Sequence, residues 1–153
     1  MKIRLFLLIV VCISIFSACG TEDPELDRTD TVAGIDADDN GIRDDIDAYI
    51  KQTYRIEEHQ KAVNQYAKSL QASLLVDTED KIAVKAITNE KARAISCISD
   101  KIPGGKSPNG ERVVREILSM TTNTKLRLTQ YFVLDKALDG TVISLPSEDV
   151  CDE

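Results

Sequence analysis

The helical body of this chain begins at one acidic stretch, Asp36-Ala-Asp-Asp-Asn-Gly-Ile-Arg-Asp-Asp-Ile-Asp47. Its oxygen-bearing side chains have the spacing of a twelve-residue calcium loop, in which positions one, three, five, nine and twelve and the carbonyl of position seven serve the metal. The sixth position is Gly41, where the chain must turn sharply and a β-carbon is disfavoured. Hard oxygen donors in this number favour calcium over zinc or copper. The expected ligands are Asp36, Asp38, Asn40, the carbonyl of Ile42, Asp44 and Asp47.

The alternative for this stretch is an ordinary solvated turn, since acidic runs containing Asn-Gly are common in turns. Against it, carboxylates packed so densely in sequence repel one another unless a cation lies among them. The residues resemble the calcium loops of the EF-hand superfamily, and most of all the thrombospondin type 3 and related bacterial repeats, with the pattern D-x-D-x-[DN]-G-x-x-D-x-x-D. The resemblance covers about a dozen residues, so it implies a calcium site and neither a fold nor an activity.

Two residues depart from the pattern. Arg43 stands at position eight, where paired loops carry an aliphatic residue that contacts a partner loop, and Asp47 stands in place of a longer, bidentate Glu. The sequence also has no amphipathic helix before the loop and no second copy of it. We therefore expect a single structural site of low affinity, with a dissociation constant on the order of 10⁻⁴ to 10⁻³ M.

Residues 1–18 have the pattern of a secretory leader. Two basic residues precede an apolar run, Leu5–Phe16, which has the length of a signal-peptide core and is too short to span a membrane comfortably. The run ends in Phe16-Ser17-Ala18-Cys19-Gly20, which resembles the lipobox of bacterial lipoproteins. The resemblance implies cleavage before Cys19 and lipid on its sulfur and nitrogen. The alternative is an ordinary signal peptide cut after Ala18, which would leave a free cysteine.

Residues 19–33 are polar and acidic, contain Pro24 and show no apolar period, which predicts a flexible tether. Residues 34–153 are then expected to hold the calcium loop and one helical domain. The absence of Asp directly after Cys19 resembles sorting to the outer membrane. The expected location is therefore the bacterial cell envelope, on the periplasmic face of the outer membrane if the cell has two membranes.

Composition excludes some classes of partner. Without residues 1–18 the chain keeps 17 basic and 26 acidic residues, a net charge of about −9. Nucleic-acid binding needs a basic face, so we expect no nucleic-acid partner. No cluster of Lys and Arg is available to bind anionic lipid, so membrane attachment would be covalent. About 120 residues beyond the tether suffice for one core.

The four cysteines separate by position. Cys12 would leave with the leader and Cys19 would carry lipid, so Cys97 and Cys151 remain. In an oxidising compartment such a pair predicts a disulfide, which closes a loop of roughly 55 residues and contributes about 4 kcal/mol on the chain-entropy model. A reactive thiol or a metal thiolate is the alternative; there is no Cys-x-x-Cys, and the single histidine, His59, is distant in sequence.

Apolar residues at helical spacing predict an all-α bundle of four to five short helices. The pattern starts at residue 44 and continues to about 75, with a break at 53–55 left open, and includes Ile56 in its second stripe. Further helices are expected over about 79–99, 111–120 and 125–138; the last carries the apolar residues Leu126, Phe132, Val133 and Ala137. Residues 141–146 alternate and are expected to run extended over the bundle.

The sequence offers little for catalysis, so we expect no enzyme. Gly-Lys-Ser at residues 105–107 lacks the preceding strand and the spacing of a phosphate loop. His59 lies among charged neighbours, as surface histidines do. We expect a membrane-tethered envelope lipoprotein that acts as a binding or structural module with one calcium ion and an unknown protein partner. The alternative is a lipoprotein inhibitor or immunity factor against an envelope-acting toxin or hydrolase.

Overall fold

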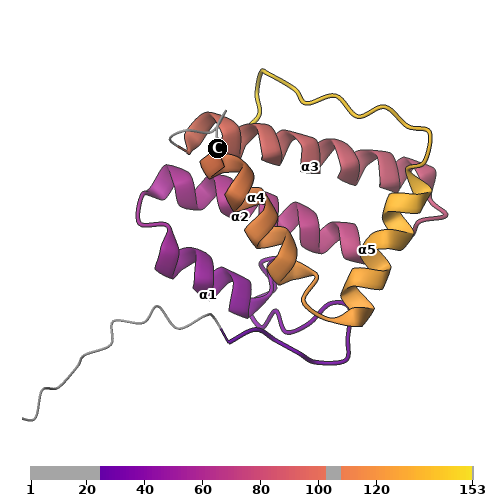
Figure 1. The fold of residues 1–153 in the computed structure, drawn as a ribbon, viewed down its shortest axis with the longest axis horizontal. Coiled ribbons are helices and arrows are strands. Elements are labelled where there is room, and N and C mark those ends of the chain that lie inside the picture. Colours follow the sequence, from indigo (N-terminus) through magenta and orange to yellow (C-terminus); the bar gives the residue numbers. More distant parts are fainter. Residues whose placement is uncertain (1–24, 103–107, 153) are drawn as a thin grey trace, which may run out of the picture.

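The computed structural model describes residues 25–102 and 108–152, and within them the fold is all-helical (Figure 1). The leader, Cys19 and the first part of the expected tether lie outside the described residues, as does the Gly-Lys-Ser sequence. The prediction of a small all-α bundle is confirmed. The helices are α1 (Asp44–Thr53), α2 (Glu57–Leu75), α3 (Lys81–Lys101), α4 (Pro108–Thr121) and α5 (Lys125–Ala137).

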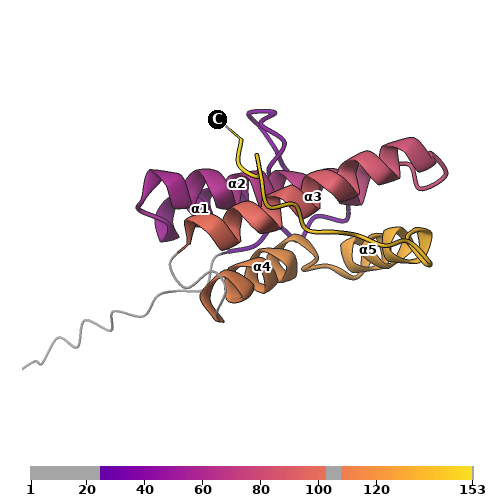
Figure 2. The same ribbon diagram turned by 90° about the horizontal axis from the view of Figure 1, so that it is seen from above.

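Helix α2 is the centre of the bundle and packs against each of the other four helices. Figure 2 shows α1, α2 and α3 in one layer, with α4 and α5 forming a second layer against it. The apolar side of α2 supplies Val63, Tyr66 and Leu70, each at most 2% exposed, to a core shared with α1, α3 and α4. Burying apolar side chains of this kind is the main favourable term in folding such a bundle.

The helix boundaries follow from local chemistry. The break left open at residues 53–55 is real, because α1 ends at Thr53 and Tyr54 is extended. Ile56 does not join the buried stripe of α2; it precedes the helix and is 56% exposed. At the start of α3 the Asp80 carboxylate accepts hydrogen bonds from the backbone N–H groups of Ile82 and Ala83, a typical N-cap. Asp80 therefore marks the start of the helix.

Helix α5 buries a different face from the one its apolar residues suggest. Leu126, Phe132 and Val133 are between 41% and 58% exposed, whereas Arg127 and Leu134 are almost fully buried. The physical reason is that Arg127 meets a carboxylate and carbonyl groups of the N-terminal segment, which compensate for burial of its charge. The outward side of α5 is consequently apolar.

The C-terminal segment returns along α3 as extended chain (Figure 1). Cys151 lies next to Cys97 of α3 with the two sulfur atoms 2.07 Å apart, in agreement with the expected disulfide. Two further contacts hold this segment: Gln65 Nε2 donates to the carbonyl of Val150 at 2.9 Å, and Arg93 Nε donates to the carbonyl of Asp149 at 3.1 Å. The last residues therefore belong to the folded domain.

Candidate functional site

Three of the predicted calcium ligands converge in the loop that leads into α1. One carboxylate oxygen from each of Asp36, Asp38 and Asp44 lies within 4.8 Å of the other two. Asp38 and Asp44 are exposed and Asp36 is partly buried, so the group is open to solvent. Three anionic oxygen donors at this separation have the ligand chemistry that Ca²⁺ prefers.

Short-range hydrogen bonds turn these side chains inward. The Asp36 carboxylate accepts from the backbone N–H of Asn40 at 3.1 Å and of Gly41 at 2.9 Å. Asp44 accepts from the N–H of Ala37 at 3.0 Å, which closes the loop from its other end. Gly41 has φ +86°, a value that favours glycine, as its place in the sequence predicts. Backbone N–H groups of the loop thus donate to the carboxylates of Asp36 and Asp44.

The other predicted ligands have different surroundings. The amide of Asn40 is beside the group, since its Nδ2 donates to Asp38 at 3.0 Å and its Oδ1 accepts from the N–H of Ile42 at 2.8 Å. The side chain of Ile42 is buried in the core. Asp47 lies within α1 and is outside the group of three; its carboxylate is 2.5 Å from the ammonium of Lys51. The Lys51 ammonium therefore competes with a cation for the Asp47 carboxylate.

Lys51 also interacts electrostatically with other carboxylates of the acidic loop. Its hydrogen bond to Asp47 is the largest cause of a raised pKa, and the charges of Asp47, Asp38 and Asp44 contribute in the same direction. The lysine therefore remains an ammonium and supplies positive charge to one side of the loop. Of the predicted ligands, the carboxylates that the structure brings together are those of Asp36, Asp38 and Asp44.

Arg43, the departure at position eight, has a function that the loop pattern did not indicate. Its side chain is fully buried, and its Nε and Nη2 donate to the carboxylate of Asp45 at 2.8 and 2.6 Å. Its guanidinium also donates to the last carbonyls of α4, those of Met120 at 3.2 Å and Thr121 at 3.3 Å. Donors at a helix C-terminus satisfy carbonyls that have no partner within the helix. Arg43 thus joins the end of the loop to α4.

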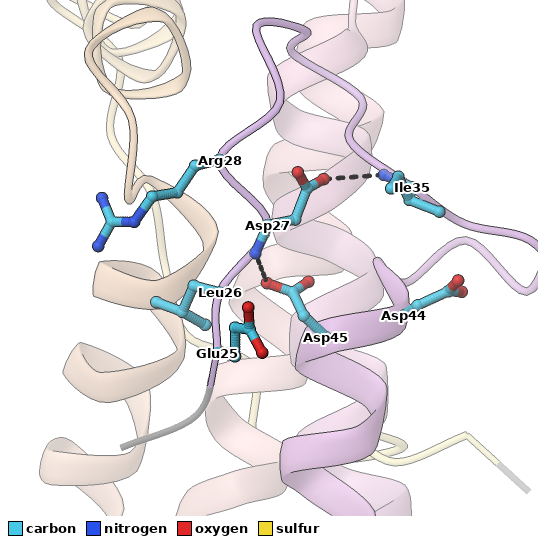
Figure 3. Close-up of a pocket in the computed structure, with 7 residues that line it drawn as sticks. All are labelled: Glu25, Leu26, Asp27, Arg28, Ile35, Asp44 and Asp45. Carbon is cyan, nitrogen blue, oxygen red and sulfur yellow. Dashed lines mark hydrogen bonds between the residues drawn. The ribbon is translucent and has the colours of Figure 1, made fainter. Parts of the chain in front are cut away.

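The segment expected to be a flexible tether is, from residue 25, part of the fold, so that prediction is wrong for residues 25–33. Arg127 of α5 donates to the carbonyl of Asp27 at 2.6 Å and to its carboxylate at 3.1 Å. Figure 3 shows two more bonds of Asp27: its N–H donates to Asp45 at 2.8 Å, and its carboxylate accepts from the N–H of Ile35 at 3.0 Å. Asp27 of this acidic segment thus has a buried cationic partner, Arg127.

Asp27 and Asp45 form the inner charge cluster together with Arg43 and Arg127. Burial opposes ionisation of Asp27, but hydrogen bonds from Thr29 and Ile35 and the Arg127 charge outweigh it and lower the pKa of Asp27 to about 2. The pKa of Asp45 is also lowered, because hydrogen bonds from Arg43 and Asp27 outweigh its burial. Both carboxylates are therefore ionised at neutral pH.

The inner charge cluster and the acidic loop meet at the start of α1 but use different side chains. In Figure 3 the carboxylate of Asp44 points away from Asp27 and Asp45, and the backbone N–H of Asp27 donates directly to the Asp45 carboxylate. The first two residues of α1 thus have different partners. Asp44 accepts a hydrogen bond within the loop, and Asp45 binds Arg43 and the N-terminal segment. The loop and the contacts of the N-terminal segment are therefore neighbours at the start of α1.

No protein-family model, curated protein or solved structure matches this chain. None of the helices in the described ranges has the length and apolar character needed to span a membrane.

Proposed function

We propose that this protein is a lipid-anchored module of the bacterial cell envelope in which one structural calcium ion stabilises the start of the helical domain. The observation that carries the calcium part is the approach of the Asp36, Asp38 and Asp44 carboxylates to within 4.8 Å of one another, directly before α1. The proposed role is to bind and position, without catalysis, at the membrane to which Cys19 is attached.

The effect of calcium follows from the charges in the loop. Like charges at such short separations repel, and a divalent ion among them replaces repulsion by attraction. At millimolar calcium and the affinity expected above, binding would stabilise the folded state by roughly 0.4 to 1.4 kcal/mol. Because Asp44 is the first residue of α1, the gain would act on the end of the bundle to which the N-terminal segment is bound.

Calcium titration with thermal melting of the full chain in detergent tests the site. We expect millimolar calcium to raise the melting temperature by about 1 to 5 °C and equal magnesium to raise it less. The double variant Asp36→Asn with Asp38→Asn should lose the shift. Asp39→Asn is the matched control, because Asp39 is in the same loop with φ +54°, a conformation that Asn tolerates. No shift in the wild type, or an equal shift in the double variant, would overturn the calcium proposal.

The lipid anchor is tested separately by mass spectrometry of the purified protein. We expect the first residue of the mature chain to be Cys19 with acyl groups on sulfur and nitrogen. The Cys19→Ala variant should lose both the lipid mass and the membrane fraction of the protein. An unmodified cysteine at the mature N-terminus would contradict the anchor and leave the calcium proposal untouched.

A further inference from the structure

The outward side of α5 is an apolar surface on an otherwise acidic protein. Leu126, Leu128 and Val133 are 41% to 42% exposed and Phe132 is 58% exposed, all on the same 13-residue helix. They share that side with Lys125 and Lys136, and we call these six residues the α5 face. From it we propose that the α5 face rests on the surface of the phospholipid bilayer that holds the anchor, a proposal that depends on the lipid anchor proposed above.

The charges of the α5 face suit this occupant. The only acidic residue of α5 is Asp135, which acts on Lys91 of α3, and that lysine lies 5.5 Å from the ring of Tyr131 on the inner side of α5. Asp135 is itself exposed, so the exposed side of α5 carries two lysines and one carboxylate, a net positive charge, although the full chain has a net charge of −7. A helix with Leu and Phe beside Lys is the type that lies in the interface of a membrane with anionic headgroups.

The neighbouring helix in the same layer has no such surface. The exposed positions of α4 are polar or charged and include Glu111, Arg112, Arg115 and Ser119. Of the two helices in this layer, α5 therefore exposes large apolar side chains and α4 exposes polar ones. Contiguous exposed apolar area on a small protein indicates a site of interaction.

The length of chain before the structure places the bilayer within reach. Asp27 is hydrogen-bonded to Arg127 in the first turn of α5, and Asp27 is eight positions after Cys19 in the sequence. Eight residues span at most about 27 Å when fully extended. The connector is shorter than the 15 residues expected from sequence, because residues 25–33 are bound to the helices. An anchored Cys19 therefore holds the beginning of α5 close to the bilayer.

A second copy of the chain is a poorer occupant. Two α5 faces that docked on each other would enclose Lys125 and Lys136 of both copies, and Asp135 is the one carboxylate of α5 that could pair with these lysines. Like charges directed at each other in an interface disfavour association. The bilayer instead offers phosphate groups to the lysines and acyl chains to the apolar residues.

The chain has no tryptophan, so a single indole can report on the face. Phe132→Trp places it at the centre of the α5 face, and Ile82→Trp is the control at an equally apolar position that is 83% exposed on α3. Each lipidated full-length variant is reconstituted in vesicles of phosphatidylethanolamine and phosphatidylglycerol, with or without brominated acyl chains. We expect bromination to quench the indole at position 132 by at least about a third and to leave that at position 82 nearly unchanged.

Equal quenching at both positions, or none at position 132, would overturn the proposal. So would a blue shift at position 132 that grows with protein concentration before vesicles are added, which would assign the face to a second copy. Mass spectrometry of the same sample separates the two proposals. Acylated Cys19 together with an unquenched indole at position 132 would refute the proposed contact of the α5 face with the bilayer and would support the lipid anchor. If Cys19 is unmodified, the anchor fails, and quenching by vesicles added to the free protein would still support the α5 face.

Discussion

Replacing Arg43 with Met tests the link between the loop and α4. The guanidinium is fully buried and its ion-pair partner, the Asp45 carboxylate, is only 9% exposed. In the variant Asp45 would keep only backbone donors, the N–H groups of Asp27 and Ile46, while two carbonyls of α4 would lose the Arg43 donor. Removing one member of a buried ion pair costs about 3–5 kcal/mol, since the other charge stays buried. We expect the free energy of unfolding to fall by that amount.

Urea unfolding followed by circular dichroism at 222 nm measures the change. The control is Arg115→Met, which removes an exposed ion pair with Glu111 within α4 and should cost less than about 1 kcal/mol. The double variant Arg43→Met with Asp45→Asn should lose less stability than the sum of the single changes, by at least about 1 kcal/mol. Similar losses for Arg43→Met and Arg115→Met would refute the reasoning, because burial would then have no energetic consequence.

Four further outcomes are expected. Reducing the disulfide should lower the free energy of unfolding by about 4 kcal/mol, measured by urea unfolding with and without reductant. Because the pKa of Asp27 is lowered to about 2, its contribution of about 1–2 kcal/mol should be complete above pH 4 and lost as the pH falls toward 2, and Asp27→Asn should flatten that part of the acid-stability curve. Gly34→Ala should destabilise more than Gly140→Ala in thermal melts: both have positive φ, but only at Gly34 would the β-carbon overlap a buried side chain, 2.2 Å from its nearest atom. If calcium binds, Lys51→Met should tighten it about threefold or more in a calorimetric titration, since the ammonium no longer competes for Asp47.

The helices were predictable because their signals are local. Apolar residues at helical spacing and an acid at the start of α3 lie within a few residues of the structure they specify. The pairing of Cys97 with Cys151 followed from the assignment of the other cysteines to the leader and the lipid site, and the structure agrees. Such features need no knowledge of which distant segments meet.

The burial of two arginines was not predictable in the same way. The partners of Arg127 in the N-terminal segment are 95 to 100 residues away, and the α4 carbonyls bound by Arg43 are 77 and 78 residues away. A residue pattern assigns a charged side chain to solvent unless its partner is known. One signal was present, because Arg127, Tyr131, Leu134 and Leu138 share a helical face on which only the arginine is charged.

In the candidate site, too, the features that depend on nearby residues were predictable, and those that depend on competing partners were not. The carboxylates that converge are held by bonds spanning four to seven residues, which a twelve-residue pattern encodes. Asp47 is different, because once α1 forms, Lys51 lies one turn further on and competes for its carboxylate. Residue spacing alone does not show whether the Asp47 carboxylate binds the Lys51 ammonium or a metal ion. The loop therefore has Lys51 paired with Asp47, whereas the carboxylates of Asp36, Asp38 and Asp44 form no ion pair within the described residues.

The two acidic groups at the start of α1 differ in whether cationic side chains already neutralise them. The inner charge cluster is already neutralised by Arg43 and Arg127, so adding a cation there gains nothing. The outer loop has Lys51 on one side only, and its three converging carboxylates keep their mutual repulsion. A divalent ion would therefore be expected to stabilise the loop and not the cluster. Since Asp44 and Asp45 are adjacent on α1, the proposed ion would lie close to the contacts that hold the N-terminal segment.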